Sequence, residues 1–249
     1  MIELNAYFFA LAIPAVIFAG VSKGGFGSGA AFAATPLLAL VLDPGAAIGL
    51  MLPLLMLMDV TALKPYWRKW SVPHARVLIL ASLPGVALGA VFYSVADPDL
   101  FRLLIGVIAI GFVLWRLFGR ARMEGARRLP AWVGPIAGIV AGFTSFISHA
   151  GGPPAAVYLL AQGLGKTTYQ ATTVIVFWVI NMVKFVPYAM LGIFSWDTLV
   201  ADLLLIPVAV FGVWLGVKCH HALSERTYFA ITYVFLVLSG AKLIWDALT

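Results

Sequence analysis

Long apolar runs follow one another along almost the whole chain and constrain its fold more than any other feature. They occupy Leu4–Gly20, Ala30–Leu42, Ala46–Leu63, Ala75–Ala96, Leu100–Phe118, Ala131–Ser148, Pro154–Ala161, Thr172–Leu191, Leu199–Val217 and Tyr228–Leu248. Of the 249 residues, 63% are hydrophobic and 10% are charged, whereas a soluble domain carries about 25% charged residues. Because a crossing helix needs about 20 apolar residues, the runs predict an integral membrane protein with room for about eight to ten spans.

The runs predict helices and not strands. A strand of a membrane barrel alternates polar and apolar residues over about ten positions, and these runs are continuous. The expected fold class is therefore all-α, with a polytopic chain. Two runs, Ala30–Leu42 and Pro154–Ala161, are too short to cross comfortably, and each directly follows a glycine-rich stretch. We expect these two runs to be discontinuous or re-entrant helices.

The formal net charge of +6 has a membrane explanation. Lysine and arginine collect in the cytoplasmic loops of membrane proteins, so we expect a lipid bilayer and no nucleic acid as partner. The single cysteine, Cys219, allows no internal disulfide, and no zinc-ligand spacing occurs. We therefore expect no metal and no cofactor. No basic stretch precedes Leu4–Gly20, which predicts a retained first helix.

Features of the first half of the sequence recur in the second half at a constant spacing. The matched pairs are Gly20 and Gly142, Gly29 and Gly151, Asp59 and Asn181, and Tyr66 and Tyr188. We therefore divide the chain into a first transmembrane repeat, a basic cytoplasmic linker and a second transmembrane repeat, at residues 1–118, 119–130 and 131–249.

The charges predict that the two repeats are inverted relative to each other. Basic residues gather in the loop after the third run and in the linker, at Lys64, Arg68, Lys69, Arg76, Arg116, Arg120, Arg122, Arg127 and Arg128. Acidic residues gather at the other helix ends, at Asp97, Asp99, Asp197, Asp202 and Asp246. With the basic loops in the cytoplasm, both termini lie outside and equivalent loops face opposite sides. Arg102, Lys184 and Lys242 depart from this pattern, and we expect them to snorkel from outer helix ends.

Inverted repeats with interrupted helices are typical of secondary transporters, which bind substrate between the repeats near the middle of the membrane. The first interruption, 22–29, contains four glycines and would be unstable as a helix facing lipid. Free N–H groups at the start of the next helix favour an anion, and Lys23 adds a full charge. The alternative is a glycine-rich packing surface between helices, with Lys23 reaching the inner interface.

The second interruption, 144–154, carries polar donors in place of glycines. Ser145, Ser148 and His149 face the same cavity if the two halves meet. His149 is a possible proton carrier or anion ligand, because an imidazole titrates near neutral pH. The alternative is a neutral imidazole bonded to a backbone carbonyl.

Asp59 and Asn181 occupy matched positions in the two halves. Asp59 is a candidate for proton coupling. The alternative is a solvated carboxylate, or one paired with Lys64, near the cytoplasmic helix end. Lys184 and Gln162 are weaker candidates for a functional role.

At these residues the sequence resembles the sulfite exporter TauE/SafE family, also grouped as sulfonate uptake permeases. The resemblance rests on GVSKGGFGSGAAFAATPLLAL, on GFTSFISHAGGPPAAVYLL and on the helix spacing around them, and it covers essentially the whole chain. It implies a carrier of the bacterial cell inner membrane for sulfite, sulfoacetate or a related organosulfur anion. It also implies that export is a common direction, with proton coupling through His149 or Asp59.

Carried over residue by residue, the resemblance implies substrate contacts from both segments, at Ser22, Lys23, Gly24, Gly25, Ser28, Ser145, Ser148 and His149. The second segment has Ser-His where the first has Gly-Ser, so a symmetric two-motif site is not implied. A passive anion channel and a carrier for another small carboxylate or sulfonate are the alternatives. An enzyme is not expected, because the HExxH and GxSxG motifs do not occur. A homodimer is compatible with the sequence.

Overall fold

The computed structural model describes residues 4–26, 31–119, 129–219 and 225–249, and no strand occurs among them. The long helices are α1 (Ala6–Val21), α3 (Pro44–Tyr66), α4 (Val72–Val95), α5 (Pro98–Leu114), α9 (Lys166–Met190), α10 (Trp196–Cys219) and α11 (Glu225–Leu248). Within the described residues, 7 helical segments are long and apolar enough to cross a membrane. The predicted all-α, polytopic membrane fold is therefore confirmed at this level.

The count of long segments is lower than the sequence predicted, because three of the apolar runs form shorter helices. These are α2 (Ala34–Leu38), α7 (Val133–Ser148) and α8 (Gly152–Leu160). A π-helical turn, η1 (Ser22–Phe26), extends α1, and a short 3₁₀ turn, η2 (Ala31–Ala33), precedes α2. Three positions of the first glycine-rich stretch, Gly27, Ser28 and Gly29, lie outside the described residues, as do the linker arginines 120, 122, 127 and 128.

Helix boundaries follow ordinary capping chemistry. The Asn5 side chain accepts a hydrogen bond from the Phe8 backbone N–H at 2.9 Å and begins α1. Asp97 does the same for Leu100 at 2.7 Å, with Pro98 in the first turn of α5. At the other extreme, α7 ends at Ser148, and the next residue, His149, has a φ of 57°, a left-handed conformation usually taken by glycine. This turn separates α7 from α8.

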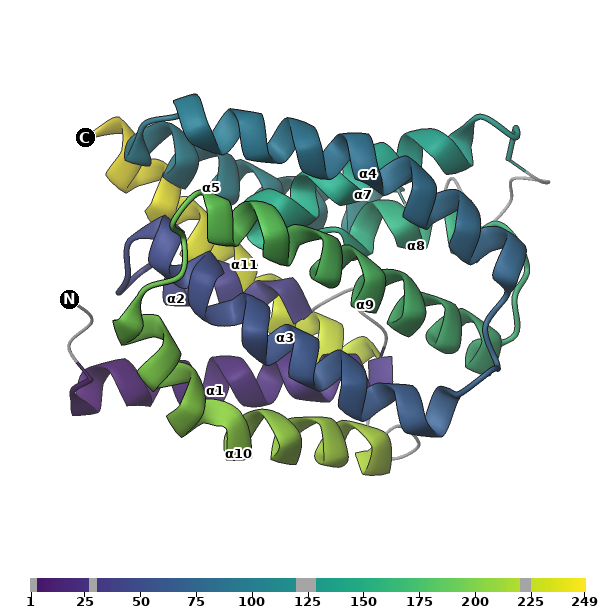
Figure 1. The fold of residues 1–249 in the computed structure, drawn as a ribbon, viewed down its shortest axis with the longest axis horizontal. Helices are drawn as coiled ribbons and strands as arrows, with labels where there is room; N and C mark the ends of the chain where they lie inside the picture. Colours follow the sequence, from purple (N-terminus) through teal and green to yellow (C-terminus); the bar gives the residue numbers. More distant parts are fainter. Residues whose placement is uncertain (1–3, 27–30, 120–128, 220–224) are drawn as a thin grey trace.

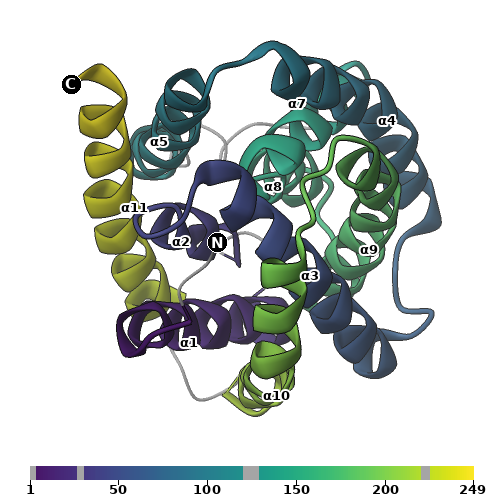
Figure 2. The same cartoon turned by 60° about the vertical axis from the view of Figure 1, so that its left-hand side comes forward.

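The helices form one bundle in which segments from the two halves of the chain alternate (Figure 1). α1 begins and α11 ends at the same end of the molecule. α4 packs along α7, and α1 packs along α10. α3 contacts α9, and α5 contacts α11. Figure 2 shows α3 near the centre of the bundle, where it is the most enclosed of the long helices.

Glycines allow the closest of these helix contacts. A Cβ atom added at Gly20 would lie 2.8 Å from the backbone of Gly212, so α1 and α10 meet backbone to backbone. A Cβ added at Gly142 would collide with the backbone of Ser82 and hold α7 away from α4. Small residues at such crossings are typical of helix association in membranes.

Charged residues divide between the two ends of the bundle. One end carries the basic residues around the α3–α4 link and at the nearby ends of α9 and α10. These residues are Lys64, Arg68, Lys69, Arg76, Lys166 and Lys218. The opposite end carries Asp43, Asp97, Asp99, Asp197 and Asp246. There Arg102 pairs with Asp99 and Asp43, and Lys242 pairs with Asp246. Asp202, expected at this acidic end, is instead buried within the bundle on α10.

The α3–α4 and α9–α10 links lie at opposite ends of the bundle, which makes the arrangement testable by labelling. Lys69→Cys and Ser195→Cys, each in a Cys219→Ser background, are expected to react with a membrane-impermeant maleimide from opposite sides of the membrane. Labelling of both cysteines from one side would contradict the fold.

Candidate functional site

A buried ion pair joins the first glycine-rich segment to the centre of α3. The Lys23 ammonium donates to Asp59 Oδ1 at 2.5 Å, and the Asn181 amide of α9 donates to Asp59 Oδ2 at 2.7 Å. Lys23 and Asp59 are 3% and 0% exposed. A buried carboxylate is tolerated when it is paired and its remaining oxygen is hydrogen-bonded, which is the case here. The expectation of a solvated Asp59, or of one paired with Lys64, is therefore wrong.

A second buried lysine lies one turn further along α9. The Lys184 ammonium donates to the Ser145 carbonyl oxygen at 2.8 Å and lies 2.8 Å from His149 Nδ1. Its exposed fraction is 0%. The expectation that Lys184 snorkels from an outer helix end is therefore wrong. It points into the bundle because α9 presents this face to α3 and α7.

The hydrogen bonds of His149 define its protonation. Nε2 lies 3.0 Å from the Ile48 carbonyl oxygen, which can only accept, so Nε2 carries the hydrogen. Nδ1 then accepts from the Lys184 ammonium. Both ring nitrogens of a neutral imidazole are thereby occupied. This is the arrangement that the sequence left as the alternative to an anion ligand.

These side chains form one polar cluster, which we define as Lys23, Asp59, Asn181, Lys184 and His149. Asn181 and Lys184 are three residues apart on α9, so they share one helix face. The cluster brings together a lysine that follows α1 and a histidine that follows α7, one from each half of the chain. It contains two lysines, one carboxylate and a neutral imidazole, so it carries one net positive charge when both lysines are protonated.

The remaining residues predicted to contact substrate lie around this cluster with different roles. Gly24 and Gly25 pack against α10, where a Cβ on either would collide with the carbonyl oxygen of Val213 or Gly216. Close helix packing, the alternative considered for this segment, therefore describes these two glycines. Ser22 is buried in the same turn. Ser28 lies outside the described residues.

In the second segment, Ser145 contributes its carbonyl oxygen to Lys184. The Ser148 hydroxyl donates back to the Thr144 carbonyl oxygen at 3.4 Å. Within the described part of the chain, neither serine hydroxyl forms a hydrogen bond with a charged group of the cluster. The segment's main contribution is to place the His149 ring and one carbonyl oxygen beside Lys184.

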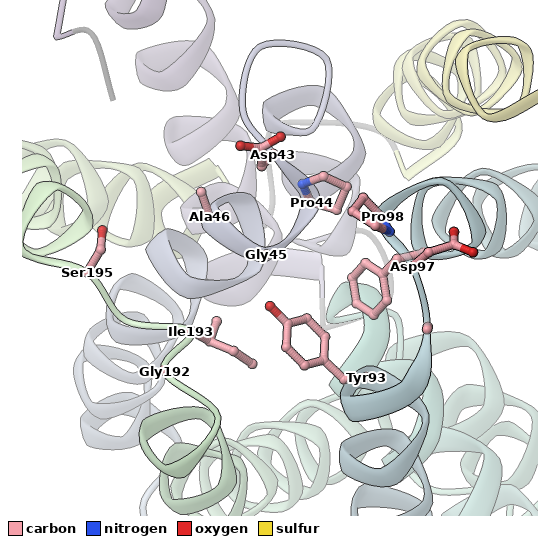
Figure 3. A pocket seen from close by; sticks show the side chains of 12 residues that line it. Asp43, Pro44, Gly45, Ala46, Tyr93, Asp97, Pro98, Gly192, Ile193 and Ser195 are labelled. Carbon is pink, nitrogen blue, oxygen red and sulfur yellow. The ribbon is translucent and has the colours of Figure 1, made fainter. Parts of the chain in front are cut away.

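A cavity opens at the acidic end of the bundle, between the first turn of α3, the end of α4 and the α9–α10 link (Figure 3). Its volume is about 430 Å³, and its lining includes Asp43, Tyr93, Asp97 and Ile193. Figure 3 shows the Tyr93 ring projecting from α4 toward Gly45. A Cβ at Gly45 would lie 2.6 Å from the Tyr93 hydroxyl, so glycine makes room for it.

Three aromatic rings lead from this cavity to the polar cluster, and we call Tyr93, Phe146 and Tyr188 the aromatic barrier. Ring centroids are 6.4 Å apart between Tyr93 and Phe146 and 4.8 Å apart between Phe146 and Tyr188. Tyr188 in turn lies 6.2 Å from His149. The Tyr188 hydroxyl donates to the Phe146 carbonyl oxygen at 2.5 Å, which fixes the ring. Phe146 and Tyr188 therefore lie between Tyr93, which lines the cavity, and His149.

The sequence contains a signal that Lys184 faces the interior of the bundle. Asn181 was matched to Asp59, and Lys184 follows Asn181 at helical spacing on the same face. Gln170 was missed altogether, and it donates to the Lys23 carbonyl oxygen at 2.9 Å. In the described ranges, no group of three or more His, Cys, Asp or Glu residues is arranged to hold a metal.

A family model described as Sulfite exporter TauE/SafE matches residues 12–243, nearly the whole chain. Neither the curated proteins nor the solved structures compared with the chain gave a match.

The ion pair predicts an asymmetric response to mutation. Lys23→Met leaves the buried Asp59 carboxylate without its cation and is expected to lower the free energy of unfolding by about 3 kcal/mol. Adding Asp59→Asn removes the orphaned charge and is expected to recover most of this loss. Denaturation in detergent measures both variants, with the exposed Lys69→Met as control. A Lys23→Met protein as stable as the wild type would contradict the buried pair.

Proposed function

The chain belongs to the sulfite exporter TauE/SafE family, and from this premise we propose that it is a secondary transporter that exports a small sulfur oxyanion or organosulfonate, such as sulfite or sulfoacetate. The family is one of membrane transporters of sulfur anions and not of enzymes. The helical bundle, with its segments long enough to cross a bilayer, agrees with that class.

The observation that carries this proposal is the positively charged polar cluster inside the bundle. Ionisable residues within membranes are costly and are retained mainly where they serve a function. Two buried lysines, when both are protonated, leave the cluster with one positive charge beyond that of the Asp59 carboxylate in surroundings of low dielectric constant, where an anion is the natural counter-charge. The anion is proposed to bind near the middle of the membrane between the two halves.

The proposed binding residues come from both segments, namely Ser22, Lys23, Gly24, Gly25, Ser28, Ser145, Ser148 and His149. Lys23 is hydrogen-bonded to Asp59, and His149 is hydrogen-bonded to Lys184. Binding of an anion by Lys23 or His149 therefore requires that these hydrogen bonds break. Protonation of Asp59 frees Lys23, and protonation of His149 places a second cation beside Lys184. Either change links the binding of the anion to the binding of a proton, and this is the proposed basis of proton coupling.

We also propose that the two halves are inverted repeats, with both termini in the periplasm of a bacterial inner membrane. The paired contacts support it, because α4 with α7 is the counterpart of α10 with α1. The direct hydrogen bond between the matched residues Asp59 and Asn181 supports it as well. The basic end of the bundle then faces the cytoplasm.

The charge distribution supports export. Basic residues at the cytoplasmic end concentrate an anion there, and carboxylates such as Asp43 and Asp97 line the opposite cavity and disfavour its return. The membrane potential adds about 2.3 kcal/mol per charge at 100 mV, which expels an anion from a negative interior. A passive channel is less well supported, because the cluster is buried and the aromatic barrier lies between it and the cavity.

Flux measurements in proteoliposomes test this proposal. Sulfite, sulfoacetate, thiosulfate and simple carboxylates are supplied in turn, with and without a pH gradient. Saturable transport of a sulfur anion that responds to the gradient is expected. Linear, unsaturable flux indicates a channel instead, and saturable transport of carboxylates alone would refute the sulfur-anion assignment.

A further inference from the structure

We propose that Lys184 is the cation that receives the substrate's charge, and that the site therefore favours a singly charged sulfur oxyanion over a doubly charged one. The proposal rests on the proposed function and narrows it. Hydrogen sulfite and simple sulfonates carry one negative charge, whereas sulfate and sulfoacetate carry two.

The two buried lysines differ in how their charge is balanced. Lys23 has the Asp59 carboxylate at 2.5 Å. Lys184 contacts a carbonyl oxygen and a neutral imidazole, both at 2.8 Å, and in the described part of the chain no carboxylate lies within ion-pair distance of it. When both lysines are protonated, the net positive charge of the cluster is therefore located at Lys184.

Lys184 also has donor capacity left. An ammonium carries three N–H groups, and two of them point to Ser145 and His149. The Tyr188 ring centroid lies 5.8 Å from the ammonium, a cation–π distance that stabilises the charge without using a hydrogen bond. The third N–H is the one that would donate to an oxyanion. Asn181, one turn away, donates to the second oxygen of the Asp59 carboxylate.

Charge balance then sets the preferred substrate. With the Lys23–Asp59 pair intact, one negative charge neutralises the cluster. A second negative charge would remain uncompensated among buried side chains, which is strongly unfavourable at low dielectric constant. A tetrahedral or pyramidal head group with one charge thus fits, and a dianion does not.

Substitution of Lys184 tests the residue assignment. Lys184→Met and Lys184→Gln are expected to weaken binding of methanesulfonate about 100-fold, as for other buried charge pairs. Lys184→Arg keeps the charge and is expected to retain part of the binding. The matched control is Lys242→Met, which removes an exposed lysine at the acidic end. Binding of methanesulfonate is measured by isothermal titration calorimetry of the purified protein in detergent, and thermal melting identifies variants that fold.

Competition between substrates tests the charge assignment in the wild-type protein. Methanesulfonate is expected to inhibit sulfite export at a concentration about tenfold lower than sulfate or sulfoacetate. If the wild type transports no sulfur anion, the proposed function itself fails. If it transports sulfite but folded Lys184→Met and Lys184→Gln bind methanesulfonate normally, or if the dianions compete equally well, only this inference fails.

Discussion

The bond between the Lys23 ammonium and the Asp59 carboxylate holds the centre of this structure together. It ties the turn after α1 to the most enclosed helix, α3, and Asn181 of α9 completes the carboxylate's hydrogen bonds. These two contacts draw both halves of the chain to one point. Lys184 and His149 follow from the same arrangement, because α9 presents Asn181 and Lys184 on one face.

The same pair explains how a charged site persists in an apolar bundle. Within the cluster each half contributes one lysine, and only the first half contributes a carboxylate, because Asn181 stands at the position matched to Asp59. The Asn181 amide donates a hydrogen bond to the Asp59 carboxylate and adds no second negative charge. The cluster therefore has one unbalanced cation when both lysines are protonated, and an unbalanced cation is what the proposed anion carrier requires.

Much of the fold was accessible from sequence, because lipid restricts a chain to few solutions. Uninterrupted apolar runs and the short run before Lys166 correctly indicated long helices and the short helix α8. Side-chain direction was not accessible for Asp59 and Lys184, because a helix position near a predicted membrane boundary fits either a solvated or an inward-facing charge. Only the packing of α3 against α9 decides between them. The roles of Gly24 and Gly25 depended likewise on how closely α10 approaches.

The central claim is that an anion binds at a buried cluster to which both halves contribute. It is tested most directly by anomalous diffraction from crystals grown with selenite, a heavier analogue of sulfite. The account predicts a selenium peak inside the bundle, within hydrogen-bond distance of the Lys184 or Lys23 ammonium. Selenium found only at the basic surface, with the cluster unchanged, would contradict it.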